Sequence, residues 1–104
     1  MAGITTHILD TALGRPAAGI AITLEIFRDH WQQVASAVTN DDGRARMLDV
    51  AERAHYRITF DVAAYNPEGF FPRVTIEFRV LEPAQHHHVP LLLSPFGYST
   101  YRGS

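Results

Sequence analysis

The sequence predicts an all-β sandwich, and three observations carry that prediction. Apolar and polar residues alternate with a period of two over most of the chain, groups of turn-forming residues separate the alternating runs, and helical patterns are nearly absent. About eight short strands fit into the 104 residues, a regular spacing that is typical of two packed sheets. We therefore expect residues 1–104 to form a single domain.

The middle of the chain contains the clearest strands. Apolar side chains alternate over residues 20–26, 56–62 and 74–80, which predicts strands with one buried face, and a weaker strand is expected at 31–38. Turn residues separate the runs at 14–16, 40–43, 66–69 and 94–97. Only residues 51–54 and 63–65 could begin a helical turn, and Pro67 would end the second one.

The first and last long strands differ from the others, because both of their faces are apolar. In residues 4–9, His7 and Leu9 lie on the face opposite Ile4, Thr6 and Ile8. Residues 88–93 also have two apolar faces, one formed by Val89, Leu91 and Leu93 and the other by His88, Pro90 and Leu92. An antiparallel sheet normally leaves one face in water, so the second apolar face indicates cover by another subunit.

Composition restricts the chemistry of any site. The chain has no Cys and no Lys, which excludes disulfides, thiolate ligands, Schiff-base chemistry and a phosphate-binding lysine. The formal net charge is -2, so the chain lacks the excess of positive charge that is typical of nucleic-acid-binding domains. No apolar run approaches the roughly 20 residues of a membrane helix. Residues 1–7 lack a signal-peptide pattern, so such a peptide is absent or already removed, and we expect a cytoplasmic protein.

Histidine is the first candidate for chemistry, since three of the six are contiguous at His86, His87 and His88. His86 and His88 point the same way along a strand and could both reach one metal ion. A second interpretation is a catalytic histidine that faces His7. A third is that the histidines are solvated or hydrogen-bonded and have no chemical role. The residue pattern alone leaves these three interpretations open.

Arg44 and the last seven residues are the other candidates. Arg44 follows the turn at 41–43, where it is either a solvated side chain or a guanidinium that binds a carbonyl or an anion through two hydrogen bonds. Residues 98–104 contain two Tyr and predict a strand that runs to the last residue. This ending is either an edge strand or a segment that carries Ser104 into a site.

These residues resemble a known family. Thr6-His7-Ile8-Leu9-Asp10, Asp42-Gly43-Arg44 and the stretch 86–104 together resemble the 5-hydroxyisourate hydrolases, the transthyretin-like enzymes of urate degradation. The resemblance spans the whole chain, and its most specific element is the Tyr-Arg-Gly-Ser ending at 101–104, which separates the enzymes from transthyretin. It implies two four-stranded sheets, a homotetramer, and active sites in a channel between dimers.

The resemblance also implies an activity: hydrolysis of the cyclic amide of 5-hydroxyisourate to 2-oxo-4-hydroxy-4-carboxy-5-ureidoimidazoline, with no cofactor and no metal. His7 and His88 would activate water, a role that suits neutral imidazole, and Arg44 would anchor the substrate and stabilise the oxyanion. Tyr101 and Ser104 would contact the substrate, and Ser104 would also orient water or substrate. The alternative is a transthyretin-like carrier that binds a small ligand without catalysis.

Two departures from the family pattern are visible. Family members usually carry a short helix after the strand that ends near residue 62, and residues 64–72 leave almost no room for it, so we expect it to be reduced or absent. His87 stands where the family more often has Tyr. Because His87 points to the face opposite His88, this exchange should matter little for catalysis.

Overall fold

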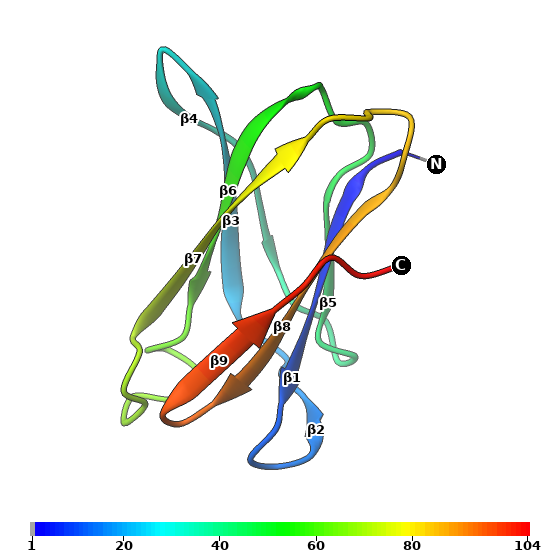
Figure 1. Ribbon diagram of the computed structural model, residues 1–104. Helices are drawn as coiled ribbons and strands as arrows, with labels where there is room; N and C mark the ends of the chain where they lie inside the picture. Colours follow the sequence, from blue (N-terminus) through cyan, green and yellow to red (C-terminus); the bar gives the residue numbers. More distant parts are fainter. Residues whose placement is uncertain (1) are drawn as a thin grey trace.

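The computed structural model describes residues 2–104, which form two β-sheets packed face to face (Figure 1). One sheet has the strand order β2-β1-β8-β9, and β5 also pairs with β1. Its strands are β1 (Ile4–Asp10), β2 (Arg15–Pro16), β5 (Arg44–Leu48), β8 (His87–Ser94) and β9 (Gly97–Thr100). The other sheet has the order β4-β3-β6-β7. Its strands are β3 (Ala21–Arg28), β4 (His30–Val38), β6 (Ala54–Asp61) and β7 (Arg73–Val80).

The first and last long strands, β1 and β8, lie side by side and run parallel, whereas all the other strand pairs are antiparallel. Their register places Ile4 beside His87 and Asp10 beside Leu93. β2 and β5 both pair with β1 on its other side, at opposite ends of that strand. The centre of this sheet is thus built from segments that are more than eighty residues apart in the sequence.

The core lies between the two sheets and follows the predicted alternation. Ile22, Leu24 and Ile26 of β3 face Ile4 and Ile8 of β1 across the sandwich, and all five are fully buried. Burying each such side chain contributes about 1.5–3 kcal/mol, so these alternating positions fix which face of each strand points outward. The outward face of β1 therefore carries Thr5, His7 and Leu9.

The all-β prediction is confirmed, as is the loss of the short helix. Residues 63–65 form a turn in which Tyr65 and Asn66 donate backbone hydrogen bonds to the Val62 carbonyl, and residues 2–104 contain no helix. The Tyr65 hydroxyl ties this turn to the other sheet by donating to Asp10 Oδ2 at 2.6 Å. Burial, and then that hydrogen bond, raises the pKa of Tyr65 to about 12.

The first sheet contains five strands, because two short segments outside the predicted strands, Arg15–Pro16 and Arg44–Leu48, both pair with β1. The predicted final strand is wrong in one detail: β9 ends at Thr100, and the chain then continues beside β8 in the same antiparallel register to an isolated bridge between Gly103 and His88. None of residues 2–104 belongs to a helix with the length and apolar character that crossing a membrane requires.

Candidate active site on the outer face of the five-stranded sheet

His7 lies on the outward face of β1, between two neighbouring strands. In the register of the sheet, His7 pairs with Arg44 on β5 and with Pro90 on β8. The two flanking residues, Ile8 and Thr6, are completely buried, so the core holds the backbone and the imidazole projects away from it. The strand pairing thus brings His7 next to Arg44, as the family resemblance implies.

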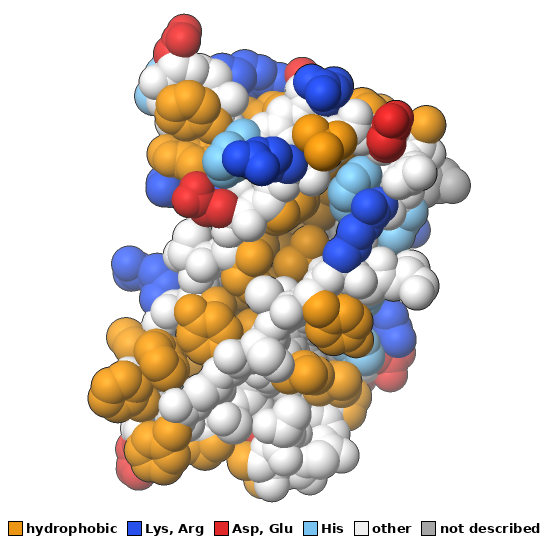
Figure 2. All heavy atoms as spheres, in the orientation of Figure 1, with side chains coloured by type: hydrophobic (Ala, Val, Ile, Leu, Met, Phe, Trp, Pro, Cys, Tyr) orange, Lys and Arg blue, Asp and Glu red, His pale blue; other side chains and the backbone are white. Residues whose placement is uncertain are grey.

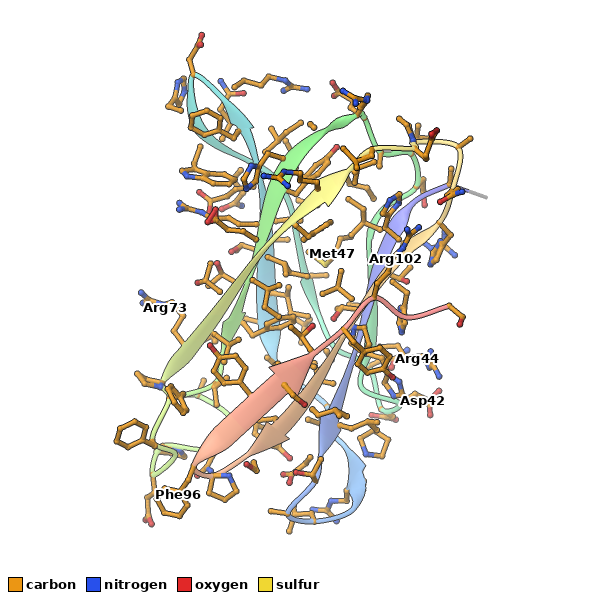
Figure 3. The ribbon with its side chains drawn as sticks, in the orientation of Figure 1. Asp42, Arg44, Met47, Arg73, Phe96 and Arg102 are labelled. Atoms are coloured by element: carbon orange, nitrogen blue, oxygen red, sulfur yellow. The ribbon has the colours of Figure 1, made fainter. Side chains whose placement is uncertain are left out.

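A tight turn positions Arg44 at the start of β5. The Asn40 side chain accepts hydrogen bonds from the backbone N–H of Asp42 at 2.9 Å and of Arg44 at 3.0 Å. Gly43 has a φ of 73°, and a Cβ there would lie 2.5 Å from the Ile8 carbonyl oxygen, so only glycine fits. Figure 3 shows Arg44 and Arg102 on the side of the molecule where the C-terminal segment runs.

His88 is the most constrained imidazole of the group. Its Nδ1 lies 2.8 Å from the Thr5 hydroxyl, and the same hydroxyl lies 2.8 Å from Nε2 of His86. The two rings stack with their centroids 6.4 Å apart, which confirms that His86 and His88 point the same way. Burial lowers the pKa of His88, and the nearby Arg44, His7 and His86 lower it further, so the imidazole is neutral near pH 7.

His87 occupies the opposite face, as predicted. It is buried with 5% of its surface exposed, and its Nδ1 lies 2.9 Å from the Gln85 carbonyl oxygen. Burial lowers its pKa, followed by the positive charge of Arg102 and by His86. His87 is therefore part of the packed interior and does not face His7 or Arg44.

The C-terminal segment packs against His88. The Gly103 N–H donates to the His88 carbonyl oxygen at 2.8 Å, and a Cβ on Gly103 would lie only 2.6 Å from Cδ2 of His88. The backbone of residue 103 is thus in contact with the imidazole, and any larger residue would displace the ring. This contact gives a physical reason for glycine in the Tyr-Arg-Gly-Ser ending.

The structure places Ser104 and Tyr101 differently from the other candidates. Ser104 is exposed beside Gly103, and within residues 2–104 no hydrogen bond joins it to His7, Arg44 or His88. Tyr101 is 59% exposed and lines a groove of about 300 Å³ together with His88 and with Ile76 and Phe78 of β7. Figure 2 shows apolar side chains on the floor of this hollow and histidine and arginine side chains to its right.

Thr5 is the one contact of this site that the sequence analysis did not single out. A threonine in a strand is ordinary, and only its position two residues before His7, on the same face, could have drawn attention to it. The described part of the chain contains no group of three or more His, Cys, Asp or Glu arranged to hold a metal ion. The arrangement instead combines the imidazoles of His7 and His88 with the guanidinium of Arg44; such groups can move protons and bind a carbonyl or an anion.

The sequence matches known proteins over nearly its whole length. The model of the HIUase/Transthyretin family matches residues 4–103. The uric acid degradation bifunctional protein TTL of Arabidopsis thaliana is 43% identical over 97% of this chain, which spans only 37% of that protein's length. The 5-hydroxyisourate hydrolase of Caulobacter vibrioides is 43% identical, and the match covers 100% of both chains.

Solved structures share the fold. A 5-hydroxyisourate hydrolase of Klebsiella pneumoniae superposes with a TM-score of 0.86 at 34% identity, over 98% of this chain and 99% of that one. Sea bream transthyretin in complex with thyroxine superposes with a TM-score of 0.85 at 29% identity, over 97% of this chain and 94% of that one. On the match of its sequence from residue 4 to residue 103, the chain belongs to the HIUase/Transthyretin family.

Proposed function

We propose that this protein hydrolyses 5-hydroxyisourate to 2-oxo-4-hydroxy-4-carboxy-5-ureidoimidazoline in the degradation of urate, as a cyclic amide hydrolase. The observation that carries the proposal is the gathering of His7, Arg44 and His88 on one outward sheet face. The relatives named 5-hydroxyisourate hydrolase, which match over nearly the whole chain, support the choice of substrate.

The proposed reaction needs an activated water, a site for the oxyanion and a proton for the leaving nitrogen. The lowered pKa of His88 keeps its imidazole neutral near pH 7, as a general base requires. We assign the activation of water to the pair His7 and His88. The Arg44 guanidinium would hold the attacked carbonyl and stabilise the negative charge that develops on its oxygen.

Tyr101 and Ser104 complete the proposed site. Both belong to the segment that Gly103 fastens to β8 by its hydrogen bond to His88. Tyr101 would contact the substrate from the adjoining groove, and Ser104 would orient water or substrate through its hydroxyl or its terminal carboxylate. The scheme requires no metal and no cofactor.

We further propose a homotetramer with its sites in a channel between dimers, built from a single hydrolase domain at residues 1–104 and located in the cytoplasm. Half-buried Leu9 and Leu92 project from the same outward face as His7, which supports cover of this face by another subunit. Light scattering at micromolar concentration tests this assembly. A monomer would remove the shared channel from the proposal.

A transthyretin-like carrier without catalysis is the second candidate, since thyroxine-bound sea bream transthyretin has the same fold. The two histidines and the arginine on the site face favour the hydrolase, because a carrier of an apolar ligand has no need of them. The loss of 5-hydroxyisourate absorbance on adding protein, measured with and without a chelator, separates the candidates. We expect the same rapid loss under both conditions. No loss would favour the carrier, and a loss that needs added zinc would favour a metal site at His86 and His88.

A further inference from the structure

We propose that Thr5 and His86 are positioning residues for His88: the Thr5 hydroxyl fixes the tautomer of His88 and passes a proton from it to His86. The hydrogen bonds that carry this proposal link one imidazole of the site to a second, exposed imidazole through a single hydroxyl group. The catalytic part of the proposal rests on the function proposed above, whereas the tautomer can be tested without any substrate.

The sheet holds the three side chains in place. Thr5 pairs with His88 in the parallel register of β1 and β8, and that pairing continues without interruption from Ile4 to Asp10. Thr5 is half-buried, and its branched Cβ restricts the hydroxyl to few rotamers. With both nitrogens at 2.8 Å, the Thr5 oxygen is a fixed junction between the two rings.

Two arrangements of protons are possible in the hydrogen-bonded series His88–Thr5–His86. A hydroxyl donates one hydrogen bond, so it donates to one ring and accepts from the other. If His88 Nδ1–H donates to Thr5, the Thr5 hydroxyl donates to His86 Nε2, and Nε2 of His88 keeps a free lone pair. If His86 Nε2–H donates to Thr5, the hydroxyl donates to His88 Nδ1, and Nε2 of His88 carries the proton. Only the first arrangement makes His88 a base.

The two arrangements are linked by one balanced step. His88 Nε2 takes a proton from water, and the resulting hydroxide attacks the substrate carbonyl. The Nδ1 proton of His88 passes to the Thr5 oxygen while the Thr5 proton passes to His86 Nε2. His88 ends neutral with a proton on Nε2, and His86 ends as an imidazolium. When His88 Nε2 gives its proton to the leaving nitrogen, the Thr5 hydroxyl returns a proton to His88 Nδ1 and takes one from His86 Nε2, which restores the starting arrangement.

Burial and charge favour this direction of transfer. His88 is half-buried next to Arg44 of β5 and His7 of β1, which disfavour a second positive charge there. His86 is exposed, so water stabilises its imidazolium. Arg102 of the C-terminal segment donates to the His86 carbonyl oxygen at 3.3 Å, which ties the backbone of residue 86 to that segment.

The kinetic test uses the full chain and 5-hydroxyisourate. Thr5→Val removes the hydroxyl at nearly constant shape. We expect kcat to fall about 10- to 100-fold, at or below the lower end of general acid–base effects because Thr5 acts only through His88, with KM changed less than about twofold. Thr5→Ser keeps the hydroxyl and should restore most of kcat. Thr59→Val is the matched control, since Thr59 bonds to Thr75 on the other sheet and should leave kcat unchanged.

A second variant tests His86, the last group in the hydrogen-bonded series. His86→Ala alters an exposed side chain, so it should fold normally and lower kcat at constant KM, and adding Thr5→Val to it should give no more loss than Thr5→Val alone. A wild-type kcat in Thr5→Val would overturn the proposal, and so would equal impairment of Thr5→Val and Thr5→Ser. A wild-type kcat in His86→Ala would overturn the proton transfer.

Ring-nitrogen NMR of ¹⁵N-labelled protein without substrate gives the tautomer directly. We expect His88 to carry its proton on Nδ1 in the wild type and to shift toward Nε2 in Thr5→Val. An active wild type with the proton on Nε2 would overturn the positioning role. An inactive wild type with the proton on Nδ1 would instead overturn the proposed hydrolase function, so the two failures are distinguishable.

Discussion

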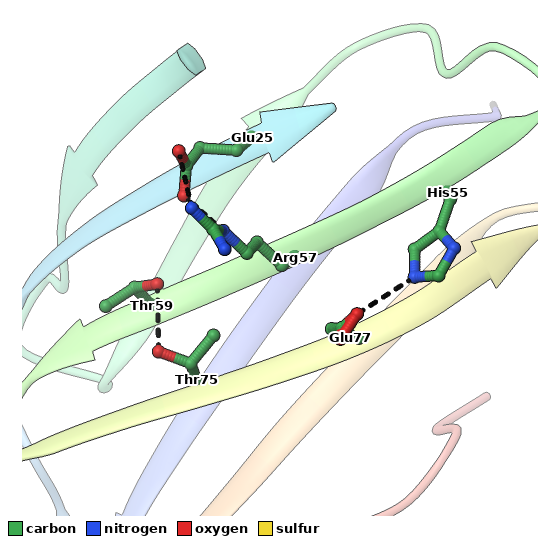
Figure 4. Close-up of polar contacts among 6 residues, drawn as sticks. All are labelled: Glu25, His55, Arg57, Thr59, Thr75 and Glu77. Atoms are coloured by element: carbon green, nitrogen blue, oxygen red, sulfur yellow. Dashed lines mark hydrogen bonds and ion pairs between the residues drawn. The ribbon is translucent and has the colours of Figure 1, made fainter. Parts of the chain in front are cut away.

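The outward faces of the two sheets use polar side chains in opposite ways. On the sheet of β3, β4, β6 and β7, polar groups bond to one another across the strands (Figure 4). Arg57 donates to both oxygens of Glu25, at 2.6 and 3.1 Å, and lies 4.3 Å from the Trp31 ring centre. These pairs satisfy their own hydrogen-bonding capacity, so this face stabilises the sheet and has little left to offer a ligand.

On the five-stranded sheet the corresponding groups are left open. Within residues 2–104, no side-chain hydrogen bond or ion pair engages His7 or the Arg44 guanidinium. His88 is bonded through Nδ1, which leaves Nε2 available. The difference teaches that the number of charged or polar groups does not identify a site. Within residues 2–104, Arg73 and Arg79 of β7 also have no hydrogen bond or ion pair, so what distinguishes the five-stranded sheet is that His7, Arg44 and His88 lie together on neighbouring strands.

The largest expected effect comes from removing an open group. Arg44→Ala or His88→Ala should lower kcat/KM for 5-hydroxyisourate by about 10²- to 10³-fold, because each removes a group that acts on the transition state. Arg57→Ala removes a paired arginine and should leave activity unchanged while lowering the free energy of unfolding by about 1 kcal/mol or less. Steady-state hydrolysis and denaturant unfolding measure both. Equal kinetic loss on the two faces would break the comparison.

The C-terminal segment should give the next largest effect. Deleting residues 102–104, or adding a C-terminal tag, should lower kcat on the order of a hundredfold, since a misplacement of about 1 Å can cost that much. The melting temperature should change little, because such terminal residues usually contribute less than about 0.5 kcal/mol. Normal turnover by a folded truncation would remove Ser104 from the site.

Gly103 allows a finer version of that test. Gly103→Ala should reproduce part of the kinetic loss, because its Cβ would push on the His88 ring. The matched control is Gly97→Ala in β9, where a Cβ meets nothing closer than the Ser94 hydroxyl at 3.7 Å. If both variants turn over substrate equally well, the contact between Gly103 and His88 does not position the imidazole.

The smallest expected effect is a pH dependence of stability. The pKa values of His87 and His88 are lowered in the folded chain, mainly by burial, so the unfolded chain binds more protons just below the ordinary histidine pKa of about 6.5. Stability is therefore full above that pH and is lost as the pH falls through the folded pKa values. Melting temperatures measured from pH 8 to pH 5 should show this, and His87→Phe should flatten the curve. An unchanged slope would show that His87 contributes nothing to it.

Period-two alternation was enough to predict most of the fold. It identified β1, β3, β4, β6, β7 and β8 and the side to which His7, His87 and His88 point, because burial of one face fixes the direction of every side chain in a strand. β5 escaped prediction although Ala45 and Met47 alternate with Arg44 and Arg46, because five residues directly after a turn give a short signal. The interruption of the last strand after Thr100 could not be predicted, nor could the contact of Gly103 with the His88 ring, because both depend on pairing with β8.

The site could be predicted only in part. The resemblance supplied His7, Arg44, His88, Tyr101 and Ser104, and the roles of these residues stay predictions. The partnership of Thr5 with His86 and His88 could not be predicted, because it depends on the parallel register of two strands at opposite ends of the sequence. Pairing between distant strands is a tertiary property, and alternation within each strand does not encode it.

The parallel pairing of β1 with β8 also determines when the site can form. Thr5 and His88 are 83 positions apart, and closing so long a loop costs entropy that grows with loop length and slows folding. During synthesis from the N-terminus, the edge of β1 that pairs with β8 has no partner until β8 has been made. Catalytic competence is therefore among the last properties that the nascent chain acquires. Recovery of hydrolysis after dilution from denaturant would then report the final folding step rather than the collapse of the core.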